Sequence, residues 1–292
     1  MTPSRFTYHA PGNLVNALRL VAESGDEAKV LAGGQSLIPL MKLRFASFPT
    51  IIDLSGVKEL HYISVEGGSL RLGAMTTTGE VEKSGAIPDT LGALKDAVSH
   101  IADPLVRNMG TVGGNVCHAD PGNDLPAVMI ALSAMFVLKR ERGERRVAAR
   151  DFFIDSFTTA IKSGELLTEI LIPLPEGNTG SSYLKQKRRA GDYSIAGVAS
   201  SLTLDAKGKI AHAAVALTSL GPKVIVAAET EKFLLGKKPE ISVAEEAGSV
   251  AAGEAQPSDD FYGTAEFKLN VLRRLMQESI ILSAKRASAG VG

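Results

Sequence analysis

Two glycine-containing loops limit the fold of this chain more than any other feature of its sequence. The first is Ala32-Gly-Gly-Gln-Ser-Leu37, between a short apolar run at 29–32 and an expected helix at 37–44. Its paired glycines permit positive φ and let a ligand approach the backbone closely. Ser36 adds a hydroxyl, and the free N–H groups at the start of the helix suit a phosphate. Taken alone, a tight turn with a serine cap explains this loop at least as well.

The second loop lies about seventy-five residues further along, at Asn108-Met-Gly-Thr-Val-Gly-Gly-Asn115. Backbone amides near Gly113 and Gly114 are expected to form an anion-binding nest. Neither loop matches the dinucleotide fingerprint G-x-G-x-x-G or the P-loop pattern G-x-x-x-x-G-K-[ST]. An ordinary Rossmann site and a P-loop nucleotide hydrolase are therefore both disfavoured.

Two carboxylates follow the second loop, in the turn Asp120-Pro-Gly-Asn-Asp124. Both are suited to accept hydrogen bonds from ribose hydroxyls, a common use of a carboxylate beside a nucleotide. The same five residues are also favourable turn chemistry ahead of a helix. The glycines, Thr111, Asn115 and the two carboxylates together exceed what a turn requires, so we favour a ligand site over a turn alone.

The remaining pattern predicts a mixture of helices and strands. Thr77-Thr-Gly-Glu80 resembles a capping box, and Asp205-Ala-Lys-Gly-Lys209 between two apolar runs predicts a hairpin. Pro, Gly, Asn and Ser gather at 173–181, which predicts a domain boundary. The spacing of apolar residues predicts helices at 13–24, 37–44, 91–101, the first part of 125–138, 224–235, 242–254 and 265–287, and strands at 29–32, 51–54, 69–74, the last part of 125–138, 194–204 and 209–219.

Charge and composition argue against several classes of protein. Thirty-two basic residues balance thirty-two acidic ones, so no net field attracts nucleic acid. The single cysteine, Cys117, excludes an intramolecular disulfide and argues against an iron–sulfur cluster in this chain. The histidines show no metal-ligand spacing, so we expect no metal site. Neither a secretory signal nor an apolar stretch of about twenty residues is present, which predicts a cytoplasmic protein without a transmembrane segment.

The two loops and their surroundings resemble the FAD-binding medium subunit of molybdenum hydroxylases. The resemblance is carried by Ala32-Gly-Gly-Gln-Ser-Leu-Ile-Pro-Leu-Met-Lys-Leu-Arg44 and by Arg107-Asn-Met-Gly-Thr-Val-Gly-Gly-Asn115 with the acidic turn that follows. It extends through 101–107, 149–153, 166–173 and 185–193, and so covers nearly the whole chain. The family includes carbon monoxide dehydrogenase, quinoline and nicotine dehydrogenases, and the flavin domain of xanthine dehydrogenase. Members that act on carbon monoxide tend to have His at the position of Gln35, which mildly disfavours that substrate here.

The resemblance implies an α+β fold of the vanillyl-alcohol-oxidase/MurB type with α/β N-terminal lobes. An FAD-binding domain would occupy residues 1–176, divided into subdomains of about 1–58 and 59–176. A smaller C-terminal domain at 177–292 would combine a three-stranded antiparallel sheet with a helical bundle.

Position by position, the resemblance also implies the residues that hold FAD. Residues 32–36 and 111–114 would bind the diphosphate, Asp124 the adenosine ribose, and Asn115 and Asp120 would line the same pocket. Lys185 would lie near the isoalloxazine, although Lys187 fits equally well. Tyr193 would cover one face of that ring, although a core aromatic at the head of a strand fits as well. The implied FAD-binding residues are Ala32, Gly33, Gly34, Gln35, Ser36, Leu37, Thr111, Gly113, Gly114, Asn115, Asp120, Asp124, Lys185 and Tyr193.

The family's activity implies an electron relay with no catalytic residue in this chain. Substrate would be oxidised at a molybdopterin centre in a large subunit, and electrons would cross two [2Fe–2S] clusters of a small subunit. FAD in this chain would pass them to an external acceptor, within a dimer of heterotrimers. Two alternatives stay open. One is a stand-alone flavin oxidoreductase of the same fold, and the other is a nucleotide-binding or scaffold subunit without redox function.

Overall fold

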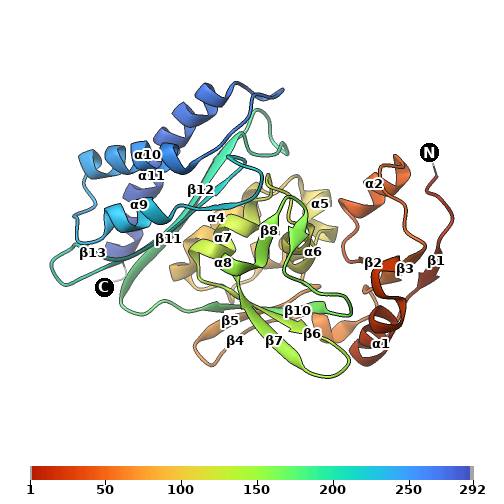
Figure 1. The fold of residues 1–292 in the computed structure, drawn as a ribbon. Coiled ribbons are helices and arrows are strands. Elements are labelled where there is room, and N and C mark those ends of the chain that lie inside the picture. Colours follow the sequence, from red (N-terminus) through yellow and green to blue (C-terminus); the bar gives the residue numbers. More distant parts are fainter. Residues whose placement is uncertain (1, 290–292) are drawn as a thin grey trace.

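The structure is a computed structural model that describes residues 2–289. Its first lobe is a small α/β unit, drawn in red and orange in Figure 1, with the parallel strand order β1-β3-β2. Helix α1 buries Ala17, Leu18 and Val21 on the side that faces this sheet. The lobe contains β1 (Thr7–His9), α1 (Leu14–Ser24), β2 (Ala28–Leu31), α2 (Leu37–Lys42) and β3 (Thr50–Asp53).

These elements confirm the predicted unit of strand, glycine loop, helix and strand. Strand β1 was not predicted, because its three residues are mostly exposed and show no apolar alternation. The parallel pairing places the ends of β2 and β3 at the same edge of the sheet, and the first glycine loop leaves β2 at that edge.

The second lobe is built on a five-stranded antiparallel sheet with the order β4-β5-β10-β6-β7. The predicted capping box is confirmed, because Thr77 and Glu80 exchange both hydrogen bonds at the start of α3. The predicted helix followed by a strand at 125–138 is also confirmed as α7 and β6. The lobe contains β4 (Ile63–Glu66), β5 (Ser69–Gly73), α3 (Thr78–Lys83), α4 (Gly92–His100), α5 (Pro104–Met109), α6 (Val112–His118), α7 (Asp124–Ala131), β6 (Met135–Lys139), β7 (Glu144–Ala148), α8 (Ala149–Phe152), β8 (Phe153–Asp155), β9 (Thr158–Thr159) and β10 (Leu166–Pro173).

The last region is an antiparallel sheet of four strands, β11-β12-β13-β14, covered by helices. The predicted hairpin is confirmed as β12 and β13. The prediction of three strands is wrong by one, because Ile225 and Val226 pair with β13 before the helix begins. Helix α9 therefore starts four residues later than the predicted 224. The region contains β11 (Asn178–Gln186), β12 (Ala196–Leu204), β13 (Ile210–Thr218), β14 (Ile225–Val226), α9 (Ala228–Leu234), α10 (Ile241–Glu254) and α11 (Ala265–Ala289).

The long helix α11 lies across β11 and β12 (Figure 1). Buried hydroxyls fill part of this contact. Ser182 and Ser200 on the strands form hydrogen bonds with Ser279 and Ser283 on the helix, at 2.7 to 2.9 Å between hydroxyl oxygens. All four side chains are fully buried. Their small volume lets the helix approach the sheet closely, and their mutual hydrogen bonds satisfy groups that would otherwise be costly to bury.

The C-terminal region is joined to the second lobe by a continuous core and by an ion pair. Tyr183, Ala199 and Ala216 of the C-terminal sheet belong to the apolar core of the second lobe. Arg286 near the end of α11 donates to both carboxylate oxygens of Asp96 on α4, at 2.6 and 2.9 Å. These contacts hold β11 against the face of the second lobe.

Candidate functional site

The two glycine loops lie against each other, although they come from different lobes. A Cβ atom on Gly33 would lie only 2.1 Å from the carbonyl oxygen of Met109 and 2.7 Å from the Cα of Gly110. A Cβ on Gly114 would lie 3.3 Å from the Cβ of Ala32. Only glycine fits at position 33, because any side chain there would push the two loops apart. The structure therefore brings the two predicted loops into one place.

The first glycine loop offers hydrogen-bond donors that the rest of the chain does not use. Within residues 2–289, the backbone N–H groups of residues 33–36 donate to no other group. The Ser36 hydroxyl is half-buried and makes no capping hydrogen bond. Gln35 Nε2 donates to the Gly33 carbonyl at 3.0 Å, which holds the loop in its conformation. A cavity of about 360 Å³ lies beside the loop, lined by Gly34, Gln35, Ile38, Pro39, Lys42 and Leu43. Several unused N–H groups and a hydroxyl beside a cavity suit an anion such as a diphosphate.

The second glycine loop uses its amides internally, so the predicted nest at Gly113 and Gly114 is wrong. Gly113 N–H donates to the Ala74 carbonyl at 2.9 Å, and Gly114 N–H donates to the Thr111 hydroxyl at 3.0 Å. Both glycines lie in the first turn of α6, which Thr111 caps. A Cβ on Gly113 would lie 2.5 Å from the Ala74 carbonyl oxygen. The second loop therefore supports the first through close packing and does not present its own amides to a ligand.

Asn115, on α6, carries a side-chain oxygen without a partner among residues 2–289. Its Oδ1 atom is buried and accepts no hydrogen bond there, while its backbone carbonyl accepts one from Asn123 Nδ2 at 2.9 Å. An unpaired buried oxygen is costly, and a ligand group that donates to it removes the cost.

Asp124 begins α7 and is buried in a cluster with two residues of β11. Its carboxylate accepts a hydrogen bond from the Tyr183 hydroxyl at 2.5 Å and pairs with Lys185 Nζ at 2.8 Å. The side chains of Lys185 and Asp124 are 2% and 7% exposed, so this is a buried ion pair. Burial raises the pKa of Asp124, and the ammonium of Lys185 opposes that effect. We call Asp124, Tyr183 and Lys185 the ring-end cluster.

This cluster brings together two residues to which the resemblance gives different parts of FAD. The resemblance implies Asp124 at the adenosine ribose and Lys185 at the isoalloxazine, and their side chains lie 2.8 Å apart. Tyr193 is the other residue expected at the ring. Burial raises the pKa of its hydroxyl, and the charges of Asp120 and Asp124 add to this effect.

Tyr193 lies over the acidic turn and is not a core aromatic. A Cβ on Gly122 would lie 3.0 Å from Tyr193 Cδ1, and the tyrosine is 48% exposed. Asp120 shapes the turn, because its Oδ1 accepts the Gly122 N–H at 2.8 Å. An aromatic ring this exposed gains little from the core, which favours a role in binding.

Sequence reasoning did not single out Lys29, which lies on β2 just before the first glycine loop. Its ammonium lies 5.7 Å from the centroid of the Phe48 ring. Its positive charge lowers the pKa of Cys117 and of His118, in each case by less than burial shifts that pKa. Burial raises the pKa of the Cys117 thiol to about 12, so the thiol is protonated at neutral pH.

Backbone strain concentrates beside the acidic turn. Of six non-glycine residues with positive φ among the described residues, three lie here: Ala119, Phe157 and Ser219. Phe157 N–H donates to the Ala119 carbonyl at 3.0 Å, and Ser219 N–H donates to the Pro121 carbonyl at 2.9 Å. Such strain costs energy and is concentrated at functional sites.

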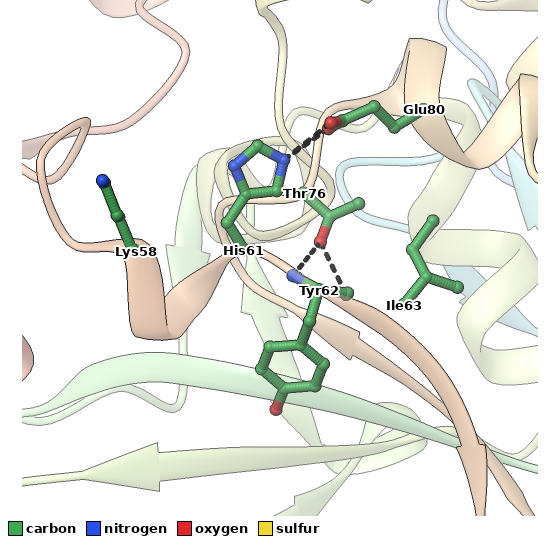
Figure 2. Close-up of a pocket in the computed structure, with 6 residues that line it drawn as sticks. All are labelled: Lys58, His61, Tyr62, Ile63, Thr76 and Glu80. Atoms are coloured by element: carbon green, nitrogen blue, oxygen red, sulfur yellow. Dashed lines mark hydrogen bonds and ion pairs between the residues drawn. The ribbon is translucent and has the colours of Figure 1, made fainter.

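A larger cavity of about 500 Å³ lies elsewhere, between the turn before β4 and helix α3 (Figure 2). Its polar groups mostly satisfy each other. His61 Nε2 contacts Glu80 at 2.7 Å, and the Thr76 hydroxyl binds the backbone of Tyr62. Figure 2 shows the Tyr62 hydroxyl pointing away from the other side chains, and it donates to Glu169 at 2.6 Å. This cavity is open but offers few free groups to a ligand.

Among residues 2–289, no group of three or more His, Cys, Asp or Glu side chains is placed to hold a metal ion. No helix in this part of the chain combines the length and apolar character needed to cross a membrane.

Comparison with known proteins decides the family. Residues 4–175 match the FAD binding domain in molybdopterin dehydrogenase, and residues 181–281 match the CO dehydrogenase flavoprotein C-terminal domain. The chain belongs to the FAD-binding medium subunits of the molybdenum hydroxylases. The carbon monoxide dehydrogenase medium chain of Hydrogenophaga pseudoflava is 37% identical over 96% of this chain and 97% of that protein.

Solved structures of the family have the same fold. Carbon monoxide dehydrogenase from Hydrogenophaga pseudoflava, lacking the Mo-pyranopterin moiety of its cofactor, matches with a TM-score of 0.94 and 38% identity, over 98% of this chain and 99% of that one. Quinoline 2-oxidoreductase from Pseudomonas putida 86 matches with a TM-score of 0.91 and 31% identity, over 98% and 99% of the two chains. This medium subunit therefore combines an FAD-binding domain with a C-terminal flavoprotein domain in a mixed α/β fold.

The residues present fit FAD. The free N–H groups at 33–36 match a diphosphate, and the buried Asn115 Oδ1 lacks a donor. At the other end of α6, the ring-end cluster and Tyr193 provide a charged pair and an exposed aromatic ring.

Proposed function

We propose that this chain is the FAD-binding electron-transfer subunit of a heterotrimeric molybdenum hydroxylase. It would receive electrons from [2Fe–2S] clusters of a small subunit and pass them to an external acceptor. Substrate would be oxidised at a molybdopterin centre in a large subunit. The observation that carries the proposal is the set of free N–H groups at 33–36, in a loop that packs against Met109. The chain also matches a medium subunit over nearly its whole length.

Within this proposal, the chain's own residues bind and orient the cofactor. The amides of 33–36 and the Ser36 hydroxyl would hold the diphosphate, while Ala32, Leu37 and residues 111–114 shape the loops around it. Asn115 and Asp120 would line the path between the two ends. Lys185 and Asp124 would hold the polar edge of the isoalloxazine, and Tyr193 would cover one face. When bound, FAD supplies the step between one-electron and two-electron carriers, which no side chain can supply.

The contacts of the two side chains favour Lys185 over Lys187 near the ring. Lys185 is buried against Asp124, whereas the Lys187 side chain makes no ion pair among the described residues. A fixed ammonium positions a ring better than a mobile one, because less conformational entropy is lost on binding.

The finer organisation is proposed on the same basis. We place the FAD-binding domain at 1–176, with subdomains of about 1–58 and 59–176 in a fold of the vanillyl-alcohol-oxidase/MurB type, and the C-terminal domain at 177–292. The two family matches change over between 175 and 181, which supports this division. We also propose a cytoplasmic dimer of heterotrimers without a transmembrane segment.

The deciding experiment is an absorbance spectrum of the chain purified from its host with its companions. Flavin bands, iron–sulfur absorbance and two companion chains carrying molybdenum are the expected result. Flavin bound to a chain that turns over substrate by itself would favour the stand-alone oxidoreductase. A colourless chain that fails to take up added FAD would refute the proposal.

A further inference from the structure

The acidic turn is held in its conformation by the C-terminal region. Carbonyl groups of a turn commonly face water, whereas the three successive carbonyls of residues 121–123 all accept hydrogen bonds from that region. The donors are, in this order, the Ser219 N–H at 2.9 Å, the Ser194 hydroxyl at 3.3 Å and the Thr218 hydroxyl at 3.0 Å. The turn is thus fixed from outside the lobe to which it belongs.

The link between Thr218 and Asn123 is the buried one of the three. Thr218 is the last residue of β13 and is 0% exposed, and Asn123 directly precedes α7 and is 7% exposed. The two residues are 95 positions apart in the sequence. A buried hydroxyl that donates to a buried carbonyl satisfies both groups, so neither can move away without cost.

The Asn123 side chain connects the turn to α6 and does not cap α7. An asparagine before a helix ordinarily accepts hydrogen bonds from N–H groups of the first turn. Among residues 2–289 the Asn123 side chain makes no such bond, and Pro126 in that turn has no N–H to donate. Asn123 Nδ2 instead donates to the Asn115 carbonyl at 2.9 Å. The amide group therefore ties the start of α7 to α6.

Asn123 lies between two residues that are proposed to face FAD. Asp124 follows it in the chain, and Asn115, whose buried Oδ1 lacks a partner among residues 2–289, accepts its hydrogen bond. Thr218 holds the backbone of Asn123, and Asn123 holds the backbone of Asn115. Groups that bind a ligand keep their geometry only when the residues behind them are fixed in this way.

We propose that Thr218 and Asn123 are positioning residues of the FAD site. They set the place of the Asn115 side chain and of the start of α7, without contacting the cofactor themselves. This inference rests on the proposed function, and it adds β13 of the C-terminal sheet to the parts of the chain on which FAD binding depends.

The test is a fluorescence titration of the FAD-free full chain with FAD. Thr218→Val keeps the shape of the side chain and removes its hydroxyl, so it should weaken FAD binding by about tenfold. Thr218→Ser restores a hydroxyl and should restore most of the affinity. Asn123→Ser leaves a group that can cap α7 but is too short to reach the Asn115 carbonyl, and it should weaken FAD binding by a similar factor.

Thr179→Val is the matched control. Thr179 is 8% exposed and donates to the Glu176 carbonyl at 3.0 Å, at the opposite end of the same sheet from Thr218. Urea unfolding of each variant separates stability from binding. Thr179→Val should lower the unfolding midpoint about as much as Thr218→Val does, because each loses one buried hydroxyl, but it should leave the FAD dissociation constant unchanged.

The outcomes distinguish this inference from the function on which it rests. A wild-type chain that takes up no FAD would refute the proposed function. A wild-type chain that binds FAD, with unchanged affinity in both Thr218→Val and Asn123→Ser, would refute only the positioning role. Equal losses of affinity in Thr218→Val and Thr179→Val would also overturn it, because the effect would then follow stability alone. Failure of Thr218→Ser to restore binding would show that the hydroxyl is not what positions the site.

Discussion

Ser36 stands at the start of α2, and its hydroxyl has no hydrogen-bond partner among residues 2–289; it lies next to the free N–H groups of 33–36. Removing this hydroxyl should affect a bound diphosphate and little else. We expect Ser36→Ala to weaken FAD binding by about tenfold or more, because a hydrogen bond to a charged group contributes about 1.5–3 kcal/mol. Fluorescence titration of the FAD-free chain with FAD measures the effect.

Ser47→Ala is the matched control, because Ser47 is exposed and forms no side-chain hydrogen bond among the described residues. Both variants should unfold at the same urea concentration as the wild type. Unchanged FAD affinity in Ser36→Ala would remove Ser36 from the diphosphate site.

At the residue scale, the sequence predicted which residues gather but not how each one is used. Gly34 lines the cavity of about 360 Å³ beside the first glycine loop, and Gly33 packs against Met109. Gly113 and Gly114 lie in a helix, and their N–H groups donate to the Ala74 carbonyl and the Thr111 hydroxyl. The contact with Ala74 could not be predicted, because it depends on how distant parts of the chain pack together. Asp124 and Lys185 are 61 positions apart in the sequence. A local sequence pattern therefore could not predict that they form an ion pair.

At the scale of elements, Glu165 ties strands β6 and β7 to the turn before β10. Its side chain is 1% exposed and bonds to Arg140 at 2.7 Å and to Arg145 at 2.8 and 2.9 Å. The hydrogen bond from Arg145 is the main reason that the pKa of Glu165 falls from 4.5 to about 2. A depressed pKa in the folded state stabilises the fold above the unfolded value of 4.5, and this contribution is lost as pH falls towards 2.

We therefore expect Glu165→Gln to lower the free energy of unfolding by about 2 kcal/mol near pH 7 and by much less near pH 3. Urea unfolding at both pH values measures the difference. Glu144→Gln serves as the control, because Glu144 is 46% exposed and its ion pair with Lys139 should contribute less than about 0.5 kcal/mol at either pH. A loss in Glu165→Gln that does not depend on pH would contradict the assigned pKa.

The elements themselves were predictable where an apolar period or a cap was strong. Helices α1, α10 and α11 and the hairpin of β12 and β13 follow their predicted ranges closely. Helix α6 was missed because two glycines in its first turn lower its helical propensity. Strand β14 was missed because two residues give no period, and only the neighbouring β13 identifies them as a strand.

At the scale of the whole molecule, Arg286 connects the end of the chain to the FAD-binding lobe. It contacts Asp96 at 2.6 and 2.9 Å and the Ser181 carbonyl at 2.7 Å. The same Asp96 carboxylate accepts the Tyr183 N–H at 3.0 Å, so the contact also fixes β11, which carries Tyr183 and Lys185 of the ring-end cluster. This arrangement joins residues up to 190 positions apart, and the sequence alone gave no sign of it.

Arg286→Met should lower the free energy of unfolding by about 2 kcal/mol and the melting temperature by about 4 °C, because several charge-assisted hydrogen bonds are lost. Differential scanning calorimetry of the full chain measures the shift. Arg274→Met is the control, since Arg274 lies on the same helix, is 72% exposed and pairs only with Glu278. Equal shifts of the melting temperature in both variants would show that the contact with Asp96 does not stabilise the fold more than an exposed ion pair does.

The contact between Gly33 and Met109 also has a consequence for the kinetics of folding. These residues are 76 positions apart, from 33 to 109, so the first glycine loop is fixed only after a long stretch of chain has closed. Closing such a loop is entropically costly and occurs late relative to local helices and hairpins. An emerging chain that has only its first lobe would lack the support that shapes the phosphate site. Binding of the cofactor would therefore follow the assembly of the second lobe. The cofactor would not guide the folding of the first lobe.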